Sequence, residues 1–158
     1  MDNQKEGVSV VVKPPVLFLL FLVLGIALSF IVKLAIFSES SAGYGYIAGG
    51  FLILLGVLLL TWAIKTFKKL GETPHHGKPI HKIIDSGPFK FTRNPIYLSF
   101  TSIYIGISII INTYWLLLFL LIMLIILHYG VILREEEYLK RKFKEEYALY
   151  KSQVGRWI

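Results

Sequence analysis

The chain contains no cysteine among its 158 residues, which excludes disulfide bonds, thiolate metal ligands and lipidated cysteines. Acidic residues are few: 10 Asp and Glu stand against 17 Lys and Arg, giving a formal net charge of +7. No G-x-G-x-x-G or Walker-type loop occurs, so a Rossmann or P-loop nucleotide site is not supported. What the chain has in excess is apolar residues, at 55%, which is above the share in an average soluble protein.

The apolar residues are bunched into runs long enough to cross a bilayer. Val16 to Phe37 holds a single charge, Lys33, whereas Tyr44 to Ile64 and Pro95 to Leu133 hold none. Because about 20 apolar residues span a membrane, each of the first two runs predicts one span. The third run is interrupted by "NTYW" at 112–115 and predicts two spans. A soluble bundle of such helices would have no polar face for water, so the sequence predicts an integral membrane protein.

The expected architecture is an all-α integral membrane domain, 1–158, with four transmembrane helices, a cytoplasmic loop and a C-terminal amphipathic helix. The spans are expected at about 16–37, 44–64, 95–111 and 115–133, the loop at 65–94 and the C-terminal helix at 134–152. In the last segment apolar residues recur at helical spacing between charged ones, as in a helix that lies at a membrane surface. The first run is too long for a signal-peptide core, so we expect it to be retained.

Lysine and arginine are distributed unevenly between the connectors. They gather after the second run at Lys65, Lys68, Lys69, Lys78, Lys82, Lys90 and Arg93, and after the last run at Arg134, Lys140, Arg141, Lys142, Lys144, Lys151 and Arg156. The other two connectors, 38–43 and 112–115, carry none. The positive-inside rule therefore predicts that both termini and the long loop are cytoplasmic. Topology and contact with anionic membrane lipid explain the charge, so nucleic acid is not expected as a partner.

The stretch "SGPFKFTRNPIYLSF", residues 86–100, joins the basic loop to the third apolar run. Asn is a favoured N-cap residue and Pro a favoured first helical residue, so Asn94 and Pro95 predict a helix start whatever the protein does. A helix start does not explain Arg93, or Tyr97 one turn into the helix at the same membrane level. On these residues alone, a binding site and a scaffold are equally supported.

A second candidate site lies where the fourth expected span ends, in "REEEYLKRKF", residues 134–143. Glu136 and Glu137 each precede a basic residue by four positions, which is ordinary pairing on a solvated helix face. Glu135 instead lies on the apolar stripe, and His128, seven residues earlier, shares its face in a continuous helix. An ionisable residue at membrane depth indicates a functional site, so Glu135 and His128 are predicted to form part of one.

The loop histidines do not predict a metal site. His75, His76 and His81 have no cysteine beside them, and the only nearby acids are Glu72 and Asp85. Loop histidines without a completed ligand set are mostly ordinary loop residues. We therefore expect no bound metal.

Taken in order, the two blocks resemble the isoprenylcysteine carboxyl methyltransferase and phospholipid methyltransferase superfamily, integral-membrane enzymes that use S-adenosylmethionine. The pattern there is G-P-aromatic-basic, R-(H/N)-P-x-Y, a span hairpin, E-E-x-x-L-x-x-x-F and E-Y-x-x-Y. It is matched here by Gly87, Pro88, Phe89, Arg93, Pro95 and Tyr97, and then by Glu135, Glu136, Leu139, Phe143, Glu146, Tyr147 and Tyr150. The resemblance covers about residues 71–157. Asn94 stands where the farnesyl-cysteine enzymes typically have His, and this form is similar to a prokaryotic branch.

The resemblance implies a methyltransferase in a prokaryotic cell membrane that uses S-adenosylmethionine at the cytoplasmic face. The implied acceptor is a lipophilic or lipid-linked molecule, such as an isoprenylcysteine-like carboxylate. The implied catalytic residues are Arg93, Asn94, Tyr97 and Glu135, and the implied cofactor-binding residues are Gly87, Pro88, Arg93, Asn94, Pro95, Tyr97, His128, Glu135 and Glu136. One alternative is a sterol-reductase-like enzyme that uses NADPH. Another is a non-catalytic four-span transporter or scaffold, which the absence of a mid-membrane carboxylate disfavours.

The two adjacent glutamates are expected to play different parts, because a helix separates neighbouring residues by about 100°. The apolar stripe directs Glu135 to the interior, where its carboxylate can accept hydrogen bonds from the cofactor's amino group or ribose hydroxyls. Glu136 is expected at the rim, paired with Lys140. Arg93 is expected to bind the cofactor's carboxylate through a charge-assisted contact.

Overall fold

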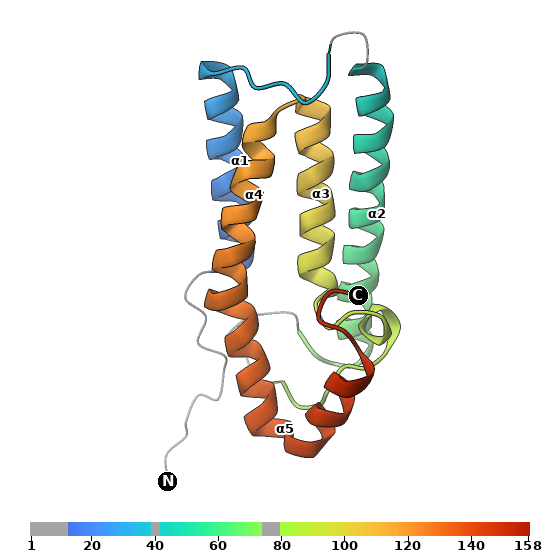
Figure 1. The fold of residues 1–158 in the computed structure, drawn as a ribbon. Coiled ribbons are helices and arrows are strands. Elements are labelled where there is room, and N and C mark those ends of the chain that lie inside the picture. Colours follow the sequence, from blue (N-terminus) through green and yellow to red (C-terminus); the bar gives the residue numbers. More distant parts are fainter. Residues whose placement is uncertain (1–12, 39–41, 74–79) are drawn as a thin grey trace.

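The computed structural model describes residues 13–38, 42–73 and 80–158, and no strand occurs among them. Four apolar helices stand side by side in the order α1, α4, α3, α2 (Figure 1). Their bounds are Pro14–Ile31 for α1, Ala42–Lys69 for α2, Pro95–Ile111 for α3 and Tyr114–Leu127 for α4. Helix α3 has 17 residues, a length of ~26 Å. Helices α1 and α2, and the continuous helical stretch Tyr114–Gln153 that begins with α4, are long and apolar enough to cross a membrane. This confirms the predicted fold class.

The connector that follows α1 and the turn between α3 and α4 are joined by hydrogen bonds. Helix α1 ends at Ile31, six residues earlier than expected from the apolar run, because the chain becomes extended at Val32. Asn112, in the left-handed conformation with φ 58°, accepts hydrogen bonds from the backbone N–H groups of Ile36 and Phe37 at 2.9 and 2.7 Å. The Trp115 indole N–H donates to the Val32 carbonyl at 2.8 Å. The polar turn therefore satisfies the backbone of the connector that leaves α1.

Small residues allow α2 and α3 to approach closely. A Cβ atom on Gly106 would lie 2.6 Å from the Gly49 carbonyl oxygen, and one on Gly49 would lie 2.6 Å from the Gly106 carbonyl oxygen. The Ser102 hydroxyl donates to the Leu52 carbonyl of α2 at 2.8 Å. Such small-residue contacts supply packing where lipid offers no hydrophobic driving force between helices. Ser102 and Gly106 therefore serve helix packing.

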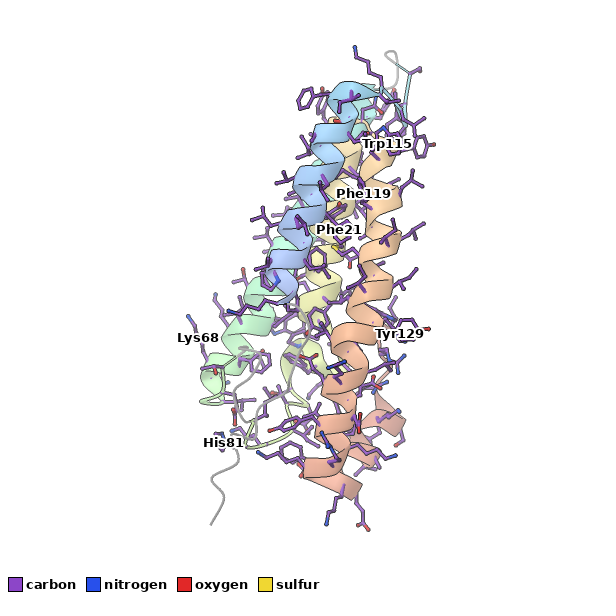
Figure 2. The ribbon with its side chains drawn as sticks, turned by 90° about the vertical axis from the view of Figure 1, so that its left-hand side faces the viewer. Phe21, Lys68, His81, Trp115, Phe119 and Tyr129 are labelled. Carbon is purple, nitrogen blue, oxygen red and sulfur yellow. The ribbon has the colours of Figure 1, made fainter. Side chains whose placement is uncertain are left out.

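Helices α1 and α4 pack through larger side chains on the opposite edge of the bundle. The rings of Phe21 and Phe119 lie between them with centroids 5.7 Å apart (Figure 2). Behind this pair, Leu116 and Met123 of α4 are fully buried in the main core. Many other large apolar side chains of the four helices are exposed, as expected for surfaces that face lipid.

Helix α4 continues through a π-helical turn, η3 (His128–Ile132), into α5 (Leu133–Gln153), which projects beyond the apolar bundle (Figure 1). The C-terminal helix was expected at 134–152; α5 covers this range but bends at Lys144, where φ is 42° and ψ is −111°. Beyond the bend, Tyr147 and Tyr150 pack with Ile83 of the loop. The bend therefore returns the chain to the end of the bundle where α2 ends and α3 begins, which we call the basic end.

Candidate functional site

The loop before α3 packs against α2 through a short 3₁₀ helix, η2 (Gly87–Lys90). Gly87 has φ +60°, and a Cβ atom there would meet the side chains of Trp62 and Thr66, so glycine is required for both conformation and space. The buried Phe89 ring meets Phe67 edge-on, with centroids 5.2 Å apart. Gly87 and Pro88, expected to bind the cofactor, thus shape the loop and do not line the cavity described next.

A cavity of about 530 Å³ lies at the basic end. Its polar lining includes Arg93, Asn94, Tyr97, Glu135, Glu136, Tyr147 and Tyr150, and its apolar lining includes Pro14, Val16, Leu60, Ile64, Phe67, Ile80, Ile83, Ile84, Phe89, Pro95, Ile96, Phe100, Ile132 and Leu139. Six of the nine residues expected at a cofactor site therefore share one cavity. The apolar wall comes from α1 and α2 as well as α3, so the cavity joins a charged wall to the membrane-spanning part of the bundle.

Tyr97 and Glu135 connect the two sequence blocks across the cavity. Tyr97 lies one turn into α3 and is buried. Its hydroxyl donates to the Glu135 carboxylate, with distances of 3.0 Å to Oε1 and 2.9 Å to Oε2. The Tyr97 phenol therefore orients the half-buried Glu135 carboxylate, which lines the cavity.

Glu136 lies at the centre of an ion-pair cluster and is not at the rim. Its side chain is only 13% exposed. The Arg156 guanidinium donates two hydrogen bonds to this carboxylate, from Nε to Oε1 at 2.8 Å and from Nη2 to Oε2 at 2.9 Å. Arg93 Nη1 lies 3.0 Å from Oε1, and Lys151 Nζ lies 3.9 Å from Oε2. In place of the expected pairing with Lys140, the bend in α5 at Lys144 brings Lys151 and Arg156 back to Glu136.

This cluster shifts the ionisation of its members. Burial opposes ionisation of Glu136, but the Arg156 hydrogen bond and the charges of Arg93, Arg156 and Lys151 outweigh it and hold the Glu136 pKa below its ordinary value. Burial also raises the pKa of Tyr147, with the Glu136 charge acting in the same direction. The glutamate is therefore ionised and the phenol protonated at neutral pH.

Arg93 is held at the wall of the cavity with part of its guanidinium unused. Its Nη1 also donates to the Tyr147 hydroxyl at 3.1 Å, and its side chain is only 9% exposed. Its Nε is buried without a hydrogen-bond partner among the residues that the structure describes. One carboxylate, Glu136, faces three cations here, so the cluster around Arg93 carries excess positive charge that suits an anionic ligand group.

Asn94 begins α3 without capping it through its side chain. Its Nδ2 instead donates to the Arg156 carbonyl at 2.9 Å, and the Thr92 hydroxyl donates to the same oxygen at 3.2 Å. The backbone N–H of Arg93 donates to the Gly155 carbonyl at 3.0 Å. The capping interpretation was therefore wrong for the side chain, which fastens the C-terminal tail (residues 154–158) to the start of α3.

His128 does not line the cavity. Its ring meets that of Tyr129 edge-on with centroids 4.9 Å apart, and Tyr129 points away from the bundle (Figure 2). The expectation that His128 shares a face with Glu135 fails because η3 is a π-helical turn between them. A π turn inserts an extra residue, so seven positions no longer complete two turns.

Of the three loop histidines, the structure describes only His81. His75 and His76 lie outside the described residues, and His81 lies at the edge of the loop (Figure 2). The backbone N–H of His81 donates to Glu72 Oε1 at 3.0 Å, and its Nδ1 lies 3.4 Å from the same oxygen. Within the described ranges, no group of three or more His and acidic residues is placed to hold a metal ion.

A family model for phospholipid methyltransferases matches residues 44–146, which is more than half of the chain. The chain belongs to this family. The match confirms the resemblance read from the two sequence blocks, and it makes the protein a membrane methyltransferase by family. The phospholipid methyltransferase match includes both Arg93–Tyr97 and Glu135–Glu136 but ends before Tyr147, Lys151 and Arg156. Searches of curated proteins and of solved structures gave no match.

Sequence reasoning missed Arg156 as a residue of this site. Nothing in its spacing from the two blocks indicates that it meets Glu136 and Asn94, since the contact depends on the bend at Lys144. Tyr147 and Tyr150 did carry a signal, because they belong to the E-Y-x-x-Y pattern of the superfamily. Tyr147 receives a hydrogen bond from Arg93, and the Tyr150 hydroxyl donates to the Phe89 carbonyl at 2.8 Å.

Proposed function

We propose that the protein is an S-adenosylmethionine-dependent methyltransferase that methylates a lipophilic acceptor at the cytoplasmic face of the membrane. The observation that carries this proposal is the single cavity in which the Arg93–Tyr97 block, the Glu135–Glu136 block and an apolar wall meet. A polar cofactor reaches such a cavity from water, and a lipophilic acceptor reaches it from the bilayer. The family match supplies methyl transfer as the reaction.

The residues that line the cavity fit S-adenosylmethionine. A volume of about 530 Å³ lies within the roughly 300–1,000 Å³ range of small-molecule sites. Arg93, with an unused Nε and excess positive charge around it, suits the cofactor's carboxylate. Glu135, which lines the cavity and accepts a hydrogen bond from Tyr97, suits the cofactor's amino group or ribose hydroxyls and balances its positive sulfonium.

The protein's part in the reaction is alignment and exclusion of water. When bound, S-adenosylmethionine supplies a methyl group on a sulfonium that is ready for displacement by a nucleophile. Such a displacement gains most from holding the two reacting centres in line. Arg93 holds the charged ligand by its carboxylate and Glu135 by its amino group or ribose, while the apolar wall that includes Leu60, Ile64 and Phe100 orients the acceptor and keeps water out. Asn94 cannot remove a proton at neutral pH, so the acceptor is one that is already nucleophilic, such as a carboxylate.

Calorimetric titration of the purified protein tests the cofactor directly. We expect saturable binding of S-adenosylhomocysteine and S-adenosylmethionine and no binding of NADPH under the same conditions. NADPH is the matched comparison because a sterol-reductase-like enzyme would bind it in place of the adenosyl ligands. Failure of folded protein to bind either adenosyl ligand would remove the proposal.

The proposed topology places the basic end in the cytoplasm, and the absence of cysteine makes this simple to test. Gly43 lies at the start of α2 and Ser152 in the last turn of α5, and both positions are exposed. We expect an impermeant maleimide to label the Gly43→Cys variant from outside intact cells, and the Ser152→Cys variant only after the membrane is opened. Labelling of both variants on intact cells would contradict the positive-inside assignment.

A further inference from the structure

We propose that Arg156 is a positioning residue that fixes Glu136 and so keeps Arg93 available to the ligand in the cavity. Arg156 lies outside the family match, which ends at residue 146, and it is not part of the cavity lining. It therefore acts through other residues. This inference rests on the proposed function, because the ligand that Arg93 serves is the adenosyl cofactor.

The two arginines share one carboxylate unequally. Arg156 binds Glu136 with both sides of its planar fork, at 2.8 Å to Oε1 and 2.9 Å to Oε2. Arg93 touches the same carboxylate with Nη1 alone, at 3.0 Å. A bidentate pair fixes orientation as well as charge. Because Arg156 satisfies both oxygens of Glu136, Arg93 does not have to turn its own fork away from the cavity.

The main chain of Arg156 is held independently of its side chain. Its carbonyl accepts from Asn94 Nδ2 at 2.9 Å and from the Thr92 hydroxyl at 3.2 Å. On either side of it, Val154 is buried and Trp157 packs against the main core. A substitution at Arg156 therefore leaves the tail in place and removes only the side-chain ion pair with Glu136.

Loss of the Arg156–Glu136 ion pair is expected to change the pH dependence of ligand binding, which a general loss of stability would not do. Among the described residues, the charged and titratable groups that face Glu136 are Arg93 just before α3, and Tyr147, Lys151 and Arg156 from α5 and the tail. Without the Arg156 charge, Glu136 takes up a proton at a higher pH. A protonated Glu136 no longer neutralises Arg93 or orders it, so ligand affinity is lost at a higher pH as the solution is acidified.

The test is calorimetric titration of the full-length protein with S-adenosylhomocysteine from about pH 4 to 8. Arg156→Gln is expected to lower the affinity about tenfold near neutral pH. It is also expected to raise, by about 1 pH unit, the pH at which affinity falls on acidification, which we call the acid limb. Arg156→Lys, which keeps the charge without the fork, is expected to recover the acid limb but only part of the affinity. Lys140→Gln, an exposed change of the same charge on α5, is the matched control and is expected to bind as the wild type does.

Each outcome of this titration supports or overturns either the proposed function or the role of Arg156. If the folded wild type does not bind, the proposed function fails and this inference fails with it. If the wild type binds but Arg156→Gln keeps both affinity and acid limb, only the inference fails. Weaker binding of Arg156→Gln with an unmoved acid limb would show a merely structural role and would also overturn it. If Arg156→Gln does not fold, Arg156→Lys decides alone, because wild-type affinity there would show that the fork is not needed.

Discussion

Replacing Glu135 by Gln is expected to weaken binding of S-adenosylmethionine about 30-fold while leaving the fold intact. Glu135 is the half-buried carboxylate that Tyr97 orients toward the cavity. Removing its charge removes a charge-assisted hydrogen bond to the ligand's amino group or ribose, which contributes about 2 kcal/mol. The amide oxygen of Gln still accepts from the Tyr97 hydroxyl, so the link between α3 and α5 persists and the melting temperature should move little.

Comparing S-adenosylmethionine with S-adenosylhomocysteine separates the effect of Glu135 on the sulfonium charge from its effect on the amino group or ribose. S-adenosylhomocysteine lacks the sulfonium charge, so Glu135→Gln should cost it less affinity than it costs S-adenosylmethionine. The matched control is Glu137→Gln, an exposed neighbour with the same change of charge, which should bind both ligands as the wild type does. Equal affinities for wild type and Glu135→Gln, measured by calorimetry, would show that this carboxylate does not face the ligand.

The parts of the structure that could be predicted from sequence are those fixed by composition and local pattern. The three apolar runs, the third interrupted at 112–115, specify four helices, because only closed backbone hydrogen bonding is tolerated in lipid. The α3–α4 hairpin then returns the chain to the side from which it left, so the Arg93–Tyr97 and Glu135 blocks had to lie at one end. Glu135 itself was located by the apolar stripe, and it lines the cavity.

The remaining features depend on two local departures from an ideal helix that carry no sequence signature. The π-helical turn at His128–Ile132 contains no proline, and it rotates His128 out of phase with Glu135. The bend is placed at Lys144, a residue that disfavours positive φ. It is stabilised by packing of the residues beyond it against the loop, which a local pattern cannot show. The misassignment of Glu136 and the oversight of Arg156 both follow from that bend.

Replacing Glu136 by Gln is expected to give the largest loss of stability, about 3 kcal/mol at neutral pH. Its side chain is 13% exposed, and its carboxylate is the shared counter-charge of Arg93 and Arg156, with Lys151 nearby. Removing one partner of a buried ion pair leaves the other charges uncompensated, which costs about 3–5 kcal/mol. For a chain of this size that corresponds to a fall of roughly 6–12 °C in melting temperature, measured in the same detergent for both proteins.

The pH dependence of this loss identifies its cause. The Glu136 pKa is lower in the folded protein than its ordinary value of 4.5, so its stabilising contribution is complete above that value. The contribution is lost as the pH falls through the depressed folded-state pKa, where the wild type also becomes neutral at this position. The difference in melting temperature between wild type and Glu136→Gln should therefore be constant above about pH 5 and shrink below it. A difference that stays the same down to about pH 3 would show that shape, rather than charge, is what Glu136 contributes.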